Sequence, residues 1–192
     1  MGNFWIKMLY RGMWKFSYIA GTLKARLLGV KVGKGTKIAL SAKIFYNPLG
    51  SIEFGKNCIV FPGVVLAPHG HGSIRFGDNC SINPYCVIYG HGGLVVGNDV
   101  RMATQCVLIP ANHRFEGSHE PIRLQGLSKK GIRVGDNVWF GAGVRVLDGV
   151  EIVSGCVIGA GAVVVSSLSA PGSYVGVPAK MLRRPDSVES NG

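Results

Sequence analysis

The most regular feature of the chain is an apolar residue at every sixth position. The clearest run consists of Val134, Phe140, Val146, Ile152, Ile158 and Val164, and shorter runs lie upstream at Phe54, Val60, Leu66, Phe76, Ile82, Ile88, Val96, Met102 and Leu108. This period does not fit an α-helix, because about 3.6 residues per turn would move successive positions around its surface. Short strands that turn every six residues can point each of these side chains inward. The pattern therefore predicts an all-β solenoid with triangular coils of about 18 residues.

A longer cassette repeats within this pattern and locates the insertions. Gly-Ser-Ile-x-Phe-Gly-x-Asn-Cys occurs at 50–58 and 72–80, and related copies occur at 92–100 and 130–138. Every residue in excess of a regular coil follows the third strand. We therefore expect three insertions to leave from the same corner of the prism: 70–73, 92–93 and 114–133. A loop as long as the last one is typically functional in a compact repeat domain.

The five cysteines follow the same repeat. Each lies four positions after an apolar residue, where other repeats of this chain carry Val or Ala: Cys58, Cys80, Cys86, Cys106 and Cys156. No Cys-x-x-Cys pair occurs. We expect packed free thiols in a reducing compartment, and neither disulfides nor a zinc site.

The repeat as a whole resembles that of the hexapeptide-repeat acyltransferase superfamily. The resemblance implies a left-handed parallel β-helix over residues 31–180, with the loop 114–133 leaving one corner. A β-sandwich with turn glycines is the alternative, but it would not keep one register through so many repeats. We expect a short N-terminal basic amphipathic helix at 1–30 and a C-terminal tail at 181–192.

Asn112-His113-Arg114-Phe115-Glu116, with Pro121-Ile122 and Gln125-Gly126, resembles a segment of bacterial sugar and surface-polysaccharide O-acetyltransferases. The resemblance implies that His113 is the general base and that the loop folds over a neighbouring subunit. The chemistry agrees, because a neutral imidazole can remove a hydroxyl proton near pH 7 without a covalent acyl-enzyme. Two further histidines, His69 and His91, share one repeat position and should stack along the loop-bearing corner. These two histidines could contact an acceptor, but we expect both of them, and His119, to be solvated.

Similarity to the maltose, galactoside and nodulation acetyltransferases implies roles for further residues. Asn83 and Trp139 match acceptor-binding positions, with Trp139 also beside the reactive end of the donor. Their alternative roles are a corner asparagine and a packed aromatic. Residues matching the coenzyme A contacts are Gly141, Ala142, Gly159, Ala160, Lys180 and Arg183. The frequent Val-Thr-Lys of relatives is Val164-Val165-Ser166 here, so one lysine contact to the cofactor is missing.

These matches imply transfer of an acetyl group from acetyl-CoA to a saccharide hydroxyl, in bacterial surface glycan biosynthesis, by a homotrimer that requires no metal. Two alternatives belong to other classes. A γ-type carbonic anhydrase would hold zinc with three histidines from successive coils, and His69, His91 and His113 come from such coils. The other alternative is a non-catalytic β-helix scaffold, although a scaffold has no reason to interrupt its ladder with a long loop.

The charge of the chain is concentrated near its N-terminus. The formal net charge is +11, and no acidic residue precedes Glu53. Lys7, Arg11 and Lys15 are four apart on one helical face among Trp and Phe residues. The segment is therefore expected either to attach to an anionic membrane, as suits a lipid-linked saccharide acceptor, or to cap the open end of the β-helix.

No run of apolar residues is long enough to span a membrane, and no secretory cleavage site follows the N-terminal segment. We therefore expect a cytoplasmic protein, peripheral to the inner face of the membrane if the N-terminal helix binds lipid. Basic charge alone also suits nucleic acid, but no nucleic acid partner is expected from the resemblance.

Overall fold

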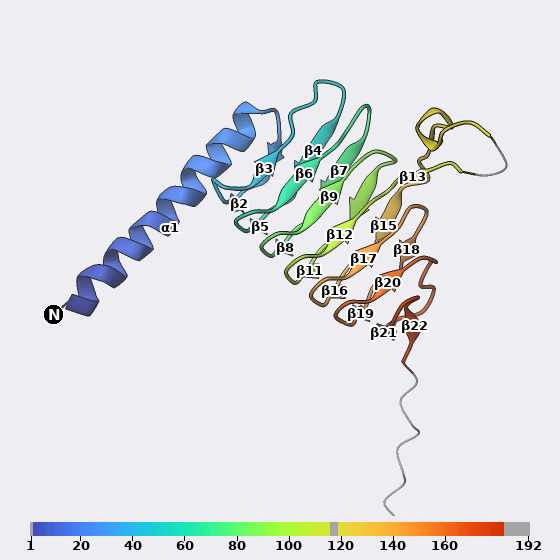
Figure 1. Cartoon of the computed structure of the whole chain (residues 1–192). Helices are drawn as coiled ribbons and strands as arrows, with labels where there is room; N and C mark the ends of the chain where they lie inside the picture. The colour runs from blue at the N-terminus through green and yellow to red at the C-terminus, as the bar shows by residue number, and fades with distance from the viewer. Residues whose placement is uncertain (1, 116–118, 183–192) are drawn as a thin grey trace, which may run out of the picture.

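Short parallel strands stack into three sheets, which form the three faces of a prism (Figure 1). The structure, a computed structural model, describes residues 2–115 and 119–182. The first face contains β1 (Lys31–Val32), β4 (Ser51–Phe54), β7 (Ser73–Phe76), β10 (Leu94–Val96), β15 (Ile132–Val134) and β18 (Glu151–Ile152). The second face contains β2 (Lys37–Ile38), β5 (Ile59–Val60), β8 (Ser81–Ile82), β11 (Arg101–Met102), β16 (Trp139–Phe140), β19 (Cys156–Ile158), β21 (Gly172–Val175) and β22 (Lys180–Met181). The third face contains β3 (Lys43–Ile44), β6 (Val65–Ala67), β9 (Val87–Tyr89), β12 (Val107–Leu108), β17 (Arg145–Val146) and β20 (Val163–Val164).

The core of the prism is made by the residues of period six. Phe54, Phe76 and Phe140 are among its largest fully buried side chains, and the rings of Phe54 and Phe76 stack with centroids 5.2 Å apart. All five cysteines are buried free thiols. Their Sγ atoms donate to carbonyls of the following coil, as from Cys106 to Gly141 at 3.2 Å. The predicted parallel β-helix and the packed thiols are therefore confirmed.

Two corners of the prism have distinct features. The loop corner is where the chain turns from the third face to the first, and all three predicted insertions leave from it, between β6 and β7, β9 and β10, and β12 and β15. The glycine corner is where the chain turns from the second face to the third, and it includes residues 141–144 and 159–162. The shared origin of the insertions was predicted from coil lengths alone.

One helix, α1 (Gly2–Leu27), closes the N-terminal end of the stack and extends beyond it (Figure 1). Its C-terminal half satisfies backbone groups that the first coil would otherwise leave unpaired. Thr22 Oγ1 accepts from Ile38 N at 3.0 Å, and Lys24 Nζ donates to Leu40 O at 2.7 Å and to Ala42 O at 2.8 Å. The capping role is thus confirmed for this half. Among the described residues, α1 included, no helix is both long and apolar enough to cross a membrane.

Gly21 is expected to be essential to this cap. A Cβ atom there would lie 2.2 Å from Ile38 O and 2.4 Å from Leu40 N, both of them backbone atoms. Gly21→Ala should therefore push α1 off the first coil and lower the free energy of unfolding by about 1–3 kcal/mol. Gly12→Ala is the matched control, because nothing lies within 4 Å of a Cβ at that helical position. It should raise stability by about 0.5–1 kcal/mol. Equal denaturation midpoints for the two variants would contradict the tight contact.

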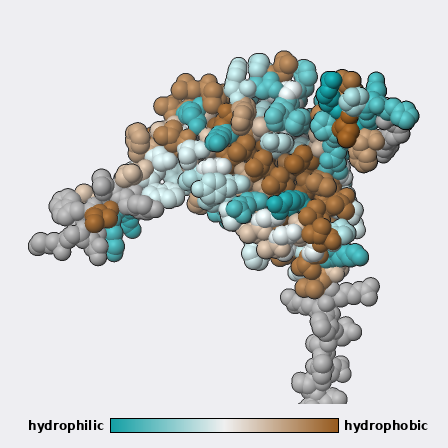
Figure 2. Space-filling model, viewed as in Figure 1, coloured by the Kyte–Doolittle hydropathy of each residue, from teal (hydrophilic) through white to brown (hydrophobic). Residues whose placement is uncertain are grey.

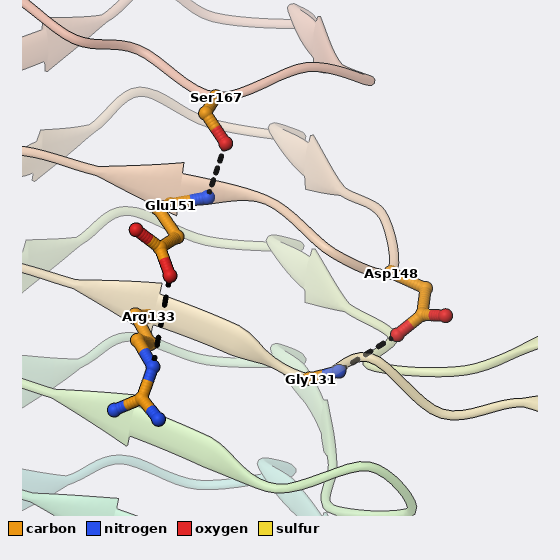
Figure 3. Close-up of polar contacts among 5 residues, drawn as sticks. All are labelled: Gly131, Arg133, Asp148, Glu151 and Ser167. Atoms are coloured by element: carbon orange, nitrogen blue, oxygen red, sulfur yellow. Dashed lines mark hydrogen bonds and ion pairs between the residues drawn. The ribbon is translucent and has the colours of Figure 1, made fainter.

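The three faces differ in what they present outward. On the first face, Arg75 pairs with Glu53 at 3.5 Å, and Arg133 pairs with Glu151 at 3.7 Å (the latter pair in Figure 3). Such exposed pairs add little stability, but they suit a surface in contact with water. Half-buried apolar side chains point outward from the second and third faces: Ile59, Val65, Val87, Val107, Val157 and Val163. Figure 2 shows a broad hydrophobic band across the stacked coils and hydrophilic surface around much of the projecting loop.

Candidate active site

The long loop leaves and returns through a small hairpin. Strand β13 (Asn112–His113) pairs antiparallel with β14 (Leu127–Ser128), with His113 opposite Leu127. The pairing continues one residue further, because Arg114 N donates to Gly126 O at 3.1 Å. Beyond it the loop contains the 3-10 helix η1 (Ile122–Leu124). His113 therefore lies on regular, hydrogen-bonded backbone at the base of the loop, and the rest of the loop follows it.

His113 lines a hollow of about 690 Å³ formed by residues of the loop and of its hairpin. The other residues lining it are Asn112, Arg114, Phe115, Glu120, Gln125, Ser128 and Lys130. The His113 side chain is exposed, and within residues 2–115 and 119–182 its ring makes no hydrogen bond. The side chain is thus open to a ligand or to another subunit. The predicted position at the mouth of the loop is confirmed.

Asp148 ties the returning strand of the loop to the next coil, a role that was not predicted from the sequence. Its Oδ2 accepts from Ser128 Oγ at 2.7 Å, and its Oδ1 accepts from Gly131 N at 2.9 Å (the latter in Figure 3). Ser128 lies directly opposite Asn112 in the hairpin. One carboxylate therefore fixes the strand that pairs with the backbone of His113. The signal for it was the Asp148-Gly149 turn at the loop corner, one coil beyond the insertion.

His69 and His91 stack at the loop corner as predicted, with ring centroids 4.2 Å apart and an interplanar angle of 22°. Tyr89 packs edge-on against His69 at 4.8 Å. The expectation that both rings are solvated is wrong for His91, because its Nδ1 is buried and has no partner among the described residues. Burial lowers the pKa of His91, and the nearby charges of His69 and Lys129 lower it further. The cause is the close stacking of successive coils, which shields a ring that a single isolated loop would expose.

The carbonic anhydrase alternative requires histidines that converge on one metal ion. Within residues 2–115 and 119–182, no three His, Cys, Asp or Glu side chains are grouped so that they could hold a metal ion. His113 lies five positions after the core residue Leu108, whereas His69 and His91 lie three positions after Leu66 and Ile88. The histidines thus share a corner but not a register.

The residues matched to the acceptor and donor lie around the glycine corner. Asn83 begins this corner after β8, and its Nδ2 donates to Met102 O at 2.7 Å. The side-chain amide nitrogen therefore already bonds to the next coil, as expected of a corner asparagine. Its Oδ1 has no hydrogen bond to the residues that the structure describes and could bind a ligand. Trp139, on the second face, is 55% exposed. Its side chain is thus not the packed aromatic of the alternative interpretation.

Small residues let neighbouring coils approach closely at this corner. A Cβ at Gly141 would lie 2.6 Å from Ala160 N, and Gly161 N donates to Ala142 O at 2.8 Å. The side chains of Ala142 and Ala160 are exposed one above the other. This corner thus offers a ligand backbone groups with little side chain in front of them. Lys180 is exposed on β22, and Arg183 lies outside the described residues.

The structure therefore separates the predicted site residues into two groups. His113 and its hollow lie at the loop corner, whereas Asn83, Gly141 and Ala160 lie at the glycine corner. The third face and the packed core lie between these corners. A single prism brings the members of each group together but does not bring the two groups together.

Comparison with known proteins agrees with the fold and the repeat. The family model described as bacterial transferase hexapeptide (six repeats) matches residues 131–166. The chain is 32% identical over 142 residues to the putative lipopolysaccharide biosynthesis O-acetyl transferase WbbJ of Escherichia coli, covering 70% of this chain and 72% of that protein. It is 38% identical over 88 residues to the probable acetyltransferase Rv3034c of Mycobacterium tuberculosis, which is 46% of this chain but only 29% of that protein.

A solved structure supports the architecture independently. AntD, an N-acyltransferase from Bacillus cereus in complex with dTDP and 3-hydroxybutyryl-CoA, superposes with a TM-score of 0.72. The match covers 87% of this chain and 89% of that chain, at 22% sequence identity. At this identity the likeness establishes the fold and not the substrate.

Proposed function

The chain belongs to the hexapeptide-repeat acyltransferase family, and from this premise we propose that it transfers an acetyl group from acetyl-CoA to a hydroxyl of a saccharide. The match with WbbJ covers 72% of that protein, which is named for lipopolysaccharide biosynthesis and O-acetyl transfer. A role in bacterial surface glycan synthesis, with a free or lipid-linked saccharide as acceptor, is part of the proposal.

The observation that carries the proposal is the exposed His113 on the rim of a polar hollow. The residues around it offer Asn, Gln, Ser, Glu and Lys groups to sugar hydroxyls, and Phe115, 70% exposed, offers a ring to the face of a sugar. His113 takes the proton of the acceptor hydroxyl while the hydroxyl oxygen forms the new ester bond to the carbonyl carbon of the acetyl group. The bond from that carbon to sulfur then breaks, and the same histidine returns the proton to the departing thiolate. The transfer needs no covalent acyl-enzyme.

The glycine corner fits the donor. Exposed Ala142 and Ala160 leave a path along the backbone for a slender pantetheine arm, and a Cβ at Gly141 would leave no room between the coils. Lys180, with Arg183 after it in the sequence, would meet the phosphates of the nucleotide. Ser166 stands where relatives carry a lysine, so we expect weaker donor binding than in those relatives.

A homotrimer is part of the proposal because one prism cannot join its two groups of site residues. The outward valines and isoleucines of the second and third faces suit contact with neighbouring copies, whereas the paired charges of the first face suit water. Around a threefold axis, the loop corner of one copy can meet the donor groove of the next. Each complete site would then use residues from two subunits.

A thiol-release assay tests this function. The protein is incubated with acetyl-CoA and a panel of mono-, oligo- and lipid-linked saccharides, and free coenzyme A is measured. We expect release that depends on a saccharide, and a product that loses its acetyl group to hydroxylamine, as an ester does and an amide does not. A hydroxylamine-stable product would show N-acylation instead. Absence of transfer to every acceptor would favour the scaffold.

Asp148 should act as a positioning residue for His113. Asp148→Ala removes the acceptor of both hydrogen bonds that hold the returning strand, so the loop should sample other positions. We expect turnover to fall by about tenfold, since hydrogen bonds to a charged group contribute roughly 1.5–3 kcal/mol each. Asp148→Asn keeps an oxygen for Gly131 N and should recover part of the loss. A variant that melts early, with turnover restored on cooling, would show that Asp148 only supports the fold.

A further inference from the structure

Helix α1 uses only part of its surface for the cap. The contacts with the first coil come from Ser17, Thr22 and Lys24, together with the buried Gly21 and Ala25. The N-terminal part of α1 extends away from the stack (Figure 1), whereas Trp14 and Lys15 still border a hollow beside the first coil. A cap accounts for the C-terminal half of the helix and leaves the long N-terminal extension without a role.

The same helix carries an exposed apolar stripe. Its members are spaced three or four residues apart, as one face of a helix requires: Met13, Phe16, Ile19, Leu23 and Leu27. Each is more than half exposed, from 57% for Leu23 to 80% for Leu27. Because Gly21 and Ala25 face the first coil, most of the stripe lies on the other side of the helix, although Ile19 and Leu23 also border a hollow of about 690 Å³ beside the first coil. Contiguous exposed apolar surface of this kind is typical of interaction sites, and sealing the end of the prism does not require it.

The charges on this helix and on the first coil are all of one sign. Lys7, Arg11 and Lys15 are exposed four residues apart along the helix, and Arg26 is exposed near its end. The first coil adds exposed lysines at the same end of the prism: Lys31, Lys34, Lys37 and Lys43. No aspartate or glutamate precedes Glu53. The N-terminal end therefore combines an apolar helix face with basic residues of the helix and of the first coil, and the first acidic residue, Glu53, lies on the next coil beside Lys31.

From this combination we propose that the apolar stripe of α1 inserts into the headgroup region of an anionic lipid bilayer. Lys15 and Arg26, at the edge of the stripe, then lie next to the lipid phosphates, and Lys7 and Arg11 lie on the opposite, polar face of the helix. Charge selects this occupant over a second copy of the chain. Identical helices packed on this stripe would bring the like charges at its edge, Lys15 and Arg26, close together, whereas an anionic surface neutralises these charges. The cap then fixes the enzyme rigidly to its membrane helix, which suits an acceptor carried by a lipid. The binding itself does not depend on the acyl transfer.

Sedimentation of the full-length chain with vesicles tests this proposal. Vesicles of phosphatidylcholine with phosphatidylglycerol should retain the protein, vesicles of phosphatidylcholine alone should retain much less, and added salt should release it. The double variant Phe16→Ser, Leu23→Ser should lower partitioning by about tenfold or more, since two large apolar side chains no longer enter the interface. Lys7→Glu with Lys15→Glu should lower it on the anionic vesicles only.

Matched variants away from the helix control for general stickiness. Leu49→Ser removes an apolar side chain that is 61% exposed on the loop corner, and Lys56→Glu with Arg75→Glu reverses two exposed charges away from the second and third faces. Both should partition like the unaltered protein. The helix variants should keep the thermal midpoint, because the altered side chains are exposed. Partitioning equal to that of the unaltered protein overturns the proposal. So does a change of mass in light scattering for Phe16→Ser, Leu23→Ser without a change in partitioning, which would identify a second copy as the occupant.

Discussion

Replacing His113 by alanine is expected to lower turnover by about 10² to 10⁴-fold, the range typical of a lost general base. The fold should be unaffected, because the side chain is exposed at the base of the loop and outside the core. Without the imidazole, the acceptor hydroxyl must give its proton to water while its oxygen attacks the thioester. The measurement is the initial rate of thiol release from acetyl-CoA with an accepted saccharide.

His119→Ala is the matched control for this prediction. It removes a second exposed histidine from the same loop, one that does not line the hollow around His113. It should keep turnover within about twofold, in keeping with the small effects of surface substitutions. Circular dichroism and thermal midpoints should be the same for both variants. Unchanged turnover in His113→Ala would remove this residue from the mechanism, and equal losses in both variants would indicate a general effect of the loop.

The sequence predicts the fold well because every coil needs the same kinds of side chain at the same positions. An inward apolar residue and a small residue four places later satisfy the same crowded interior in each coil, so that Phe54, Val96 and Phe140 are all buried as expected. Excess residues can leave only at a corner. Coil length therefore predicted where the loop begins, and with it the exposed position of His113.

Contacts between coils are harder to predict, since they depend on which side chains the stacking brings into register. Asp148 and Ser128 are 20 residues apart, and nothing local to either shows that they meet. The burial of His91 Nδ1 has the same origin. For α1, the sequence predicted a basic amphipathic helix but did not show which residues contact the first coil and which stay exposed. Gly21 and Ala25 dock on the first coil, and the apolar stripe remains outside.

The arrangement of the site around the prism was also beyond the sequence. Resemblance named His113, Asn83 and Gly141 individually, and the structure places the first at the loop corner and the other two at the glycine corner. The separation has a direct consequence for mutants. A defect at one corner and a defect at the other, carried on different copies, should compensate in a mixed assembly.

A second large loss of turnover is therefore expected when the donor groove is blocked. A neighbouring subunit with an intact groove should restore part of the activity. Ala160→Trp adds an indole at an exposed position beside Ala142, where it would occupy the path of the pantetheine arm. We expect turnover at low acetyl-CoA to fall by about 10²-fold, because the donor can no longer lie against the backbone. Ala160→Ser, which keeps a small side chain, should remain active.

Co-expression of Ala160→Trp with His113→Ala, each with its own affinity tag, tests whether sites are shared. In any trimer that contains both variants, one of the three interfaces joins an intact His113 to an intact groove, so doubly purified trimers should regain about one third of the original turnover. Each variant alone should stay inactive. Recovery of this size has no explanation within a single chain, where every copy carries a defect. If no mixed assembly forms, or if mixed assemblies are as inactive as the parent variants, the loop corner and the glycine corner do not form one site between subunits.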